Sequence, residues 1–243
     1  TLLRHTAKHA DKIVAVSESC KSELIDILDV PAERIHVIHN GVTVADFDRP
    51  FDARRLNELR QAHGIDGDYI VHLGTIEPRK NLVRLCEAFK DLRQRRKDVP
   101  KLVIVGAVGW NAGPILAAIA ALGSSATRPG YLSRADAVLL LRGARACVYP
   151  SMYEGFGLPV LEAMAARTPV VTSKVTALPE VAGCAALYDD PFDSESIARP
   201  LEDLLDDPAS AAARVATGRQ RAEAMSWDSS AEKLASLYKT LAR

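Results

Sequence analysis

The chain has 243 residues, 48% hydrophobic and 26% charged, which is the composition of an ordinary globular protein with a sizeable core. Basic and acidic residues balance at 31 each, which argues against a nucleic-acid-binding protein, and no apolar run approaches the roughly 20 residues of a membrane-spanning helix. The four cysteines are far apart, so we expect buried, reduced thiols in a cytoplasmic protein and no metal site.

Segments typical of strands and helices alternate along the chain, which predicts a parallel sheet with helices on both faces. Up to residue 106 we expect a strand at 12–16, a helix at 18–28 capped by Ser17, a strand at 34–38, a polar linker at 46–52, a helix at 53–62, a strand at 68–74, a helix at 81–96 and a strand at 101–106. Beyond it we expect a helix at 115–122, a shortened strand before Gly130, a helix at 135–142, a strand at 146–150, a helix at 158–166, a strand at 169–172, a helical turn at 179–181, an edge strand at 185–188, and helices at 194–205, 208–225 and 227–243.

The carboxyl ends of the predicted strands indicate where a ligand would bind, because open α/β sheets bind ligands beyond these ends. The residues that follow the strands are Gly74 and Thr75, Gly106 and Ala107, Pro150 and Ser151, and Thr172 and Ser173. We expect them to line a single crevice.

Two glutamates stand on either side of a glycine turn. Glu154 precedes a Gly-Phe-Gly turn at 155–157, and Glu162 lies in the following helix, which Pro159 can open. Carboxylates accept hydrogen bonds from hydroxyl groups, whereas a glycine turn and a helix N-terminus receive an anion. The segment therefore predicts a site for a polyol that carries a diphosphate. The alternative is that Glu154 is an ordinary surface carboxylate and Glu162 a first-turn glutamate favoured by the helix dipole. The two glycines argue against it, because they expose backbone amides at a cost in folding entropy.

A basic pair, Arg79 and Lys80, lies where a buried strand ends and the next helix begins. The helix dipole disfavours cations at this end unless an anion compensates for them. A diphosphate held by the guanidinium fork and the ammonium group together would do so. Two solvated basic side chains without a ligand are the alternative.

Together these segments resemble the retaining, nucleotide-sugar-dependent glycosyltransferases of the GT-B architecture, family four or glycosyltransferase group 1, and especially their mannosyltransferase-like members. The resemblance covers nearly the whole chain. The ordered motifs are Val-Ile-His-Asn-Gly-Val at 37–42, Gly-Thr-Ile-Glu-Pro-Arg-Lys-Asn at 74–81, the paired glutamates, Thr-Pro-Val-Val-Thr at 168–172, Leu-Pro-Glu-Val at 178–181 and Ser-Trp at 226–227. The resemblance implies a Rossmann-like, doubly wound parallel sheet, the C-terminal domain of a GT-B fold.

The resemblance also implies a role for each candidate residue. Arg79 and Lys80 match the pair that binds the donor diphosphate and stabilises the departing nucleotide, and Glu154 matches the glutamate near the transferred sugar. Glu162 matches the residue that hydrogen-bonds the ribose hydroxyls. The other matched positions are the loop beneath the phosphates (Gly74, Thr75), the backbone beside the base (Tyr131, Leu132) and the turn that faces sugar and phosphates (Gly155, Phe156, Gly157, Leu158).

The implied reaction transfers a hexose from a nucleotide-diphosphate sugar to a glycan or lipid-linked saccharide, with retention at the anomeric carbon. Arg79 and Lys80 replace a divalent metal in neutralising the leaving diphosphate, and no cofactor is implied. Double displacement with Glu154 as nucleophile remains open. GDP-mannose is the favoured donor and a UDP-hexose the alternative. A peripheral contact with the inner face of a membrane also stays open.

The resemblance divides the chain into three parts. Residues 1–42 match the end of an acceptor-binding N-terminal domain, residues 43–225 the nucleotide-sugar-binding domain, and residues 226–243 a helix that returns toward the first domain. The chain has no initiator methionine, so we expect a piece of a longer protein, and no histidine receives a catalytic role. The segment 123–130 departs from the family, because Pro129 removes a ladder donor from the expected strand.

Other interpretations remain. A non-catalytic sugar-nucleotide-binding or interaction module would keep the donor site without turnover. An epimerase or phosphorylase of the same fold is less consistent with the basic pair and the two glutamates. Asp46 and Asp48 fit the metal-binding Asp-x-Asp pattern of another glycosyltransferase fold, but their place after an Asn-Gly turn favours turn and N-cap chemistry.

Overall fold

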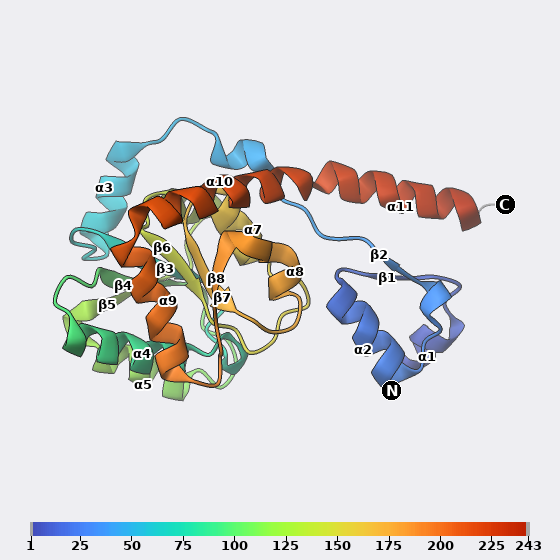
Figure 1. The fold of residues 1–243 in the computed structure, drawn as a ribbon, viewed down its shortest axis with the longest axis horizontal. Helices are drawn as coiled ribbons and strands as arrows, with labels where there is room; N and C mark the ends of the chain where they lie inside the picture. Colours follow the sequence, from blue (N-terminus) through green and yellow to red (C-terminus); the bar gives the residue numbers. More distant parts are fainter. Residues whose placement is uncertain (1, 242–243) are drawn as a thin grey trace.

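A computed structural model describes residues 2–241, and its centre is a parallel sheet of six strands in the order β5-β4-β3-β6-β7-β8 (Figure 1). The strands are β3 (Tyr69–Leu73), β4 (Lys101–Val105), β5 (Ala126–Gly130), β6 (Ala146–Tyr149), β7 (Val170–Ser173) and β8 (Ala186–Asp189). The chain adds strands first on one side of β3 and then on the other. The predicted doubly wound α/β sheet, with its last strand at an edge, is confirmed.

The helices are α1 (Leu2–His9), α2 (Glu18–Leu28), α3 (Ala53–Ala62), α4 (Leu82–Arg95), α5 (Gly113–Ala121), α6 (Arg134–Arg142), α7 (Leu158–Ala165), α8 (Leu178–Ala182), α9 (Ser194–Asp206), α10 (Pro208–Ala224) and α11 (Trp227–Leu241). The predicted elements agree with the structure to within two residues at each described end. Helix α1 was not predicted. Ser17 caps α2 as expected, because its hydroxyl accepts from the Cys20 amide.

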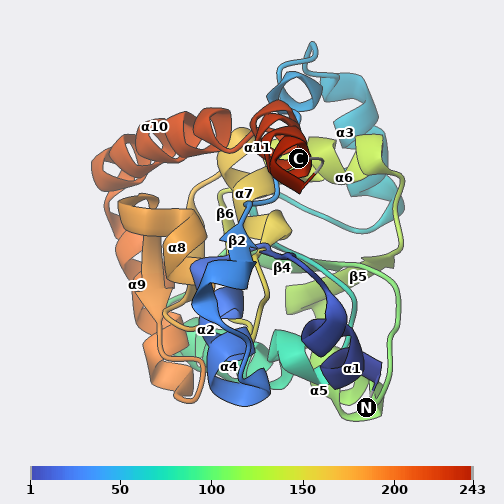
Figure 2. The ribbon, with the colours of Figure 1, turned by 90° about the vertical axis from the view of Figure 1, so that its right-hand side faces the viewer.

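The sheet is buried on both faces, and successive residues of a strand contribute to different cores. Val71 and Cys147 belong to the core beneath α3, α6, α7, α8 and α10, whereas Ile70 and Val148 belong to the core beneath α4, α5 and α9. This alternation follows from the strand geometry, in which neighbouring side chains point to opposite faces. Figure 2 shows α3 and α6 at one end of the molecule and α9 at the other.

The strand predicted to be shortened before Gly130 is complete, so that prediction is wrong. β5 has five residues and pairs with β4, and its register shifts between the pairs Val103–Thr127 and Val105–Gly130. Pro129 lies within the shift, on an edge strand, where a missing amide hydrogen costs little. The carbonyl oxygen of Gly130 still accepts from the Gly106 amide, at 2.9 Å.

The N-terminal segment forms a separate small unit beside the large sheet (Figure 1). Strands β1 (Ile13–Ala15) and β2 (Ile35–Val37) pair in parallel and pack with α1 and α2 around Ala7, Val30 and other apolar residues. Helices α10 and α11 run from the large sheet across to this unit. The connecting chain passes beneath them so closely that a Cβ atom on Gly41 would lie 2.1 Å from the Trp227 nitrogen.

Two smaller expectations concern cysteines and membranes. Cys86 and Cys147 are buried, but Cys20 is half-buried and Cys184 is exposed, so the expectation of four buried thiols is wrong. Cys184 lies in the 3-10 helix Gly183–Ala185 that follows α8, and its carbonyl oxygen accepts from Arg214 of α10. Among residues 2–241, no helix combines the length and the apolarity needed to cross a membrane.

Candidate functional site

The loops after β3 and β4 lie against each other at the carboxyl edge of the sheet. Gly106 has φ 155°, and a Cβ atom at this position would lie 1.9 Å from the Gly74 carbonyl oxygen. The Gly74 amide donates to Val105 O, at 3.0 Å, and the Ile76 amide donates to Ala107 O, at 2.8 Å. Gly74 and Thr75 are therefore held in a backbone arrangement that only a glycine at 106 permits.

Glu154 lies between both members of the basic pair. Its Oε1 is 2.6 Å from the Lys80 ammonium nitrogen, and its Oε2 is 2.6 Å from a guanidinium nitrogen of Arg79. Glu77 and the Tyr153 carbonyl oxygen accept further hydrogen bonds from Arg79. Lys80 is 6% exposed and Glu154 7%, so the ion pair is shielded from water. The structure brings together the three residues that sequence reasoning assigned to the chemistry.

Tyr149 and His72 support this cluster from below, and sequence reasoning did not assign them a role. The Tyr149 hydroxyl donates to Glu154 Oε1 at 2.9 Å and accepts from Lys80. The His72 ring stacks on Tyr149, with the ring centroids 5.4 Å apart. Both side chains are fully buried and lie near the ends of adjacent strands. In the sequence they look like core residues, so no motif indicated a role for them.

Burial and neighbouring charges set the protonation states of the cluster. Burial alone would raise the pKa of Glu154, but the hydrogen bond and charge of Lys80 outweigh it and hold this pKa below its usual range. Burial raises the pKa of Tyr149, so its hydroxyl keeps the proton that it donates to Glu154. Burial lowers the pKa of His72 to about 4, so its ring is neutral at pH 7. The cluster thus holds two cations, Arg79 and Lys80, against two carboxylates, Glu77 and Glu154.

Glu162 lies on α7 and contacts a different arginine. Its Oε1 is 2.7 Å from a guanidinium nitrogen of Arg134, at the start of α6. Pro159 opens α7 as expected, and Gly157 adopts φ 105° just before the helix. The two glutamates therefore belong to one loop and helix but bind separate cations.

The remaining candidate residues lie around this loop. Phe156 is buried and Leu158 begins α7, while Tyr131 is 81% exposed and Leu132 packs against the core. The Gly155 carbonyl oxygen accepts from the hydroxyl of Ser17, at 2.8 Å, on the N-terminal unit. The structure thus places the turn at 155–157 between the large sheet and α2.

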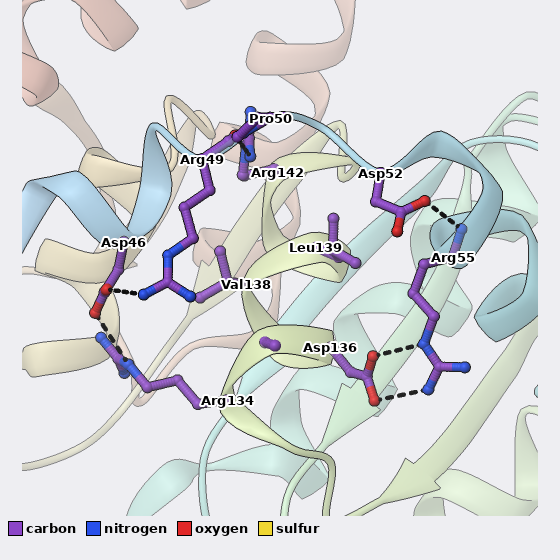
Figure 3. A pocket seen from close by; sticks show the side chains of 11 residues that line it. Asp46, Arg49, Pro50, Asp52, Arg55, Arg134, Asp136, Val138, Leu139 and Arg142 are labelled. Atoms are coloured by element: carbon purple, nitrogen blue, oxygen red, sulfur yellow. Dashed lines mark hydrogen bonds and ion pairs between the residues drawn. The ribbon is translucent and has the colours of Figure 1, made fainter.

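A groove of about 580 Å³ lies between the linker before α3 and helix α6, and Arg134, the partner of Glu162, lines it (Figure 3). Its charged walls are mutually paired: Asp46 contacts Arg49 and Arg134, and Asp136 holds Arg55 with two hydrogen bonds. Asp46 and Asp48 lie in and at the end of a 3-10 turn (Val44–Phe47), as the turn interpretation predicts, but its N-cap is Thr43. The Asp46 side chain lines this groove, and Asp48 pairs with Arg167 and Arg219. In residues 2–241, no group of His, Cys, Asp and Glu has the arrangement of a metal site.

Comparisons with known proteins identify the family of the chain. A family model described as glycosyl transferases group 1 matches residues 57–221, and one described as glycosyltransferase family 4 matches residues 1–46. The O-antigen chain mannosyltransferase B of Escherichia coli is 34% identical over 98% of this chain and 63% of its own length. An MMP α-(1→4)-mannosyltransferase of Mycolicibacterium hassiacum is 34% identical over 99% of this chain and 57% of its own. The chain therefore spans less than two thirds of these relatives.

Solved structures share the fold. A glycosyltransferase from Rickettsia africae superposes with a TM-score of 0.87 at 19% identity, over 98% of this chain and 67% of that one. The Anabaena HepE protein in complex with UDP and glucose superposes with a TM-score of 0.84 at 20% identity, over 96% of this chain and 64% of that one. The parallel sheet, the ordered motifs and the match over residues 57–221 lead to one conclusion: this chain belongs to the group 1 glycosyl transferases.

Proposed function

We propose that this chain supplies the donor site of a retaining, nucleotide-sugar-dependent hexosyltransferase. The observation that carries the proposal is the buried contact of Glu154 with both Lys80 and Arg79 at the carboxyl ends of β3 and β6. An isolated buried ion pair gains little stability, because desolvation offsets its attraction. Glu77 and Glu154 together balance the two cations, and the Arg79 side chain is 37% exposed, so a diphosphate would bind through hydrogen bonds from the guanidinium fork and the ammonium group.

In the proposed reaction, Arg79 and Lys80 bind the donor diphosphate and stabilise the charge that develops as the nucleotide departs. Glu154 orients both cations and the transferred sugar. Glu162 accepts hydrogen bonds from the ribose hydroxyls, and the backbone at 74–75, 131–132 and 155–158 surrounds the phosphates, base and sugar. No metal is needed in this scheme, because the two cations replace its charge.

The donor that we favour is GDP-mannose, and the acceptor a glycan or lipid-linked saccharide. Two relatives over nearly all of the chain are named mannosyltransferases, which supports mannose as the sugar. A UDP-hexose is the alternative, since the Anabaena HepE protein of the same fold holds UDP and glucose. In this proposal, residues 43–225 form the donor domain, and residues 1–42 and 226–243 connect it to an acceptor domain.

Calorimetric titration with GDP, UDP, GDP-mannose and UDP-glucose, with and without EDTA, tests the proposal. We expect binding of one nucleotide and its sugar that EDTA does not change, and about tenfold weaker binding or more by Lys80→Ala, which removes a charge-assisted contact. The matched control is Lys97→Ala, an exposed lysine after α4, which should bind as the wild type does. Absence of binding by all four ligands would refute the donor site.

A non-catalytic module that binds sugar nucleotides is the second candidate. The chain spans 63% and 57% of the two mannosyltransferases, so their activity need not reside in this part alone. Donor binding without transfer, even with a complete acceptor domain supplied, would favour this candidate. Transfer restored by that domain would favour the enzyme.

A further inference from the structure

Arg134 stands between two carboxylates at the rim of the groove in Figure 3. One guanidinium nitrogen is 2.7 Å from Glu162 Oε1, and another is 3.7 Å from Asp46 Oδ2. The guanidinium group also lies 5.8 Å from the ring centroid of Phe47. These contacts come from α7 and from the linker before α3, so Arg134 joins two elements that are distant in sequence.

The position of Arg134 at a helix N-terminus is unfavourable for a cation unless carboxylates lie nearby. It is the first residue of α6, whose N-cap is Ser133, and a cation at this end opposes the helix dipole. The hydrogen bond to Glu162 raises the pKa of Arg134, so this carboxylate stabilises the cation that the helix dipole disfavours. The Arg134 side chain is 56% exposed, so the pair contributes little to the stability of the fold. We expect the ion pair to affect the orientation of the Glu162 side chain instead.

Glu162 keeps an oxygen for a ligand while Arg134 holds the other. A carboxylate offers about four lone-pair sites on its two oxygens. Arg134 contacts Oε1, which restricts the side-chain rotamer, and Oε2 can accept from hydroxyl groups. A vicinal diol donates two hydrogen bonds from adjacent carbons, which suits a fixed carboxylate better than a rotating one.

We propose that Arg134 is a positioning residue that holds Glu162 in the orientation in which it accepts the two ribose hydroxyls of the donor. The inference rests on the proposed function, which assigns Glu162 to the ribose. Asp46 supports Arg134 from the opposite side and is itself bound by Arg49, so the linker before α3 takes part in the same arrangement.

The test compares two ligands that differ only in the hydroxyls. Titration uses whichever of GDP and UDP binds the wild type, together with its 2′,3′-dideoxy analogue. We expect Arg134→Gln to weaken binding of the ribonucleotide about fivefold, the usual scale of coupling between contacting residues, and to leave the dideoxy analogue unchanged. Arg134→Lys, which keeps a cation, should recover part of the loss. Arg142→Gln is the matched control, because Arg142 lines the same groove but donates to the Arg49 carbonyl oxygen.

A double variant separates positioning from general disturbance. Arg134→Gln in the background of Glu162→Gln should cause no further loss, because Arg134 acts only through Glu162. Equal weakening of both ligands by Arg134→Gln, or tighter binding of the ribonucleotide, would overturn the inference while the donor site stands. A wild-type chain that binds neither GDP nor UDP would overturn the proposed function and this inference with it.

Discussion

The Tyr149 hydroxyl connects the two charged members of the buried cluster, since it accepts from Lys80 and donates to Glu154. Tyr149→Phe removes both hydrogen bonds from a buried side chain. We expect the free energy of unfolding to fall by about 1–3 kcal/mol, the cost of leaving buried polar groups unsatisfied. Urea denaturation at pH 7 measures this change.

Tyr153→Phe is the matched control. The Tyr153 hydroxyl donates to Glu23 at the surface, and the residue is 41% exposed, so water can replace the lost bond. Its substitution should change stability by less than about 0.5 kcal/mol. If the two variants lose equal stability, the Tyr149 hydroxyl has no special part in the cluster.

Asp189, at the end of β8, is a buried acid outside the proposed donor site. Its side chain is 2% exposed, and neither oxygen has a hydrogen bond of good geometry among the described residues. Burial raises its pKa from 3.8 to about 7, against the opposing effect of the Ser173 hydroxyl and with a smaller contribution from the charge of Asp190. Because the folded state holds this proton more tightly than the unfolded state, stability is lost as pH rises from about 4 to 7.

Asp189→Asn replaces the titrating group by a neutral one of equal size. We expect its stability relative to the wild type to be constant below pH 4, to rise by about 1.4 kcal/mol per pH unit up to pH 7, and then to level off. Denaturant unfolding of both proteins at several pH values measures this difference. A flat difference for Asp189→Asn would mean that its carboxyl group finds partners when ionised.

At the scale of single residues, the sequence indicates which side chains belong to a binding site better than it indicates which side chains contact one another. Arg79, Lys80 and Glu154 could be assigned together because each stands in a recognisable motif at a strand end. Tyr149 and His72 look like ordinary core residues of buried strands, and only the pairing of β3 with β6 brings them together. Arg134 resembles any polar residue at a helix start until α7 is placed beside it.

Among the elements, the contact between the loops after β3 and β4 depends on one glycine. A Cβ atom on Gly106 would lie 1.9 Å from Gly74 O, in a backbone conformation that other residues rarely adopt. Gly106→Ala should therefore lower stability by about 3 kcal/mol and displace the loop at 74–75. Thermal unfolding and nucleotide titration measure the two effects.

Gly113→Ala is the control for that prediction. No atom lies within 4 Å of a Cβ at Gly113, the first residue of α5, and its φ angle is not positive. Alanine here should be neutral or add up to about 1 kcal/mol, because it restricts the unfolded chain. Comparable losses at both positions would show that the loop contact is not what Gly106 provides.

Element boundaries could be predicted because caps and apolar periodicity are local. Ser17 caps α2, Asp52 accepts from the Arg55 amide at the start of α3, and Pro208 begins α10. β5 was misjudged because the effect of Pro129 depends on whether its strand lies at an edge, which is a property of the assembled sheet. The register shift that accommodates Pro129 cannot be derived from a local pattern.

On the scale of the whole molecule, the small N-terminal unit contacts the large sheet around the proposed sugar site. α2 contributes Ser17 to the Gly155 carbonyl oxygen and Glu23 to the Tyr153 hydroxyl, on both sides of Glu154 in sequence. A movement of α2 would therefore move the loop that carries Glu154.

Glu180, on α8, provides the strongest of these connections. Both of its carboxylate oxygens are 2.9 Å from the Glu18 amide nitrogen at the start of α2, and Oε1 also contacts His39. A carboxylate at a helix N-terminus satisfies an unpaired amide and the helix dipole together. Here the cap comes from 162 residues away, so it stabilises the docking of α2 as well as the helix.

Glu180→Ala should therefore lower the free energy of unfolding by about 1–2 kcal/mol, the usual cost of a lost N-cap. Hydrogen exchange should become faster for the amides at 18–20 and 38–42, while the amides of β3, β4 and β6 keep their protection. Glu58→Ala is the matched control, since Glu58 pairs with Arg54 and Arg55 of its own helix, on the surface of α3. Faster exchange spread evenly over both units would mean that they unfold as one body. Faster exchange confined to the amides at 18–20 would mean that Glu180 caps the helix without holding the two units together.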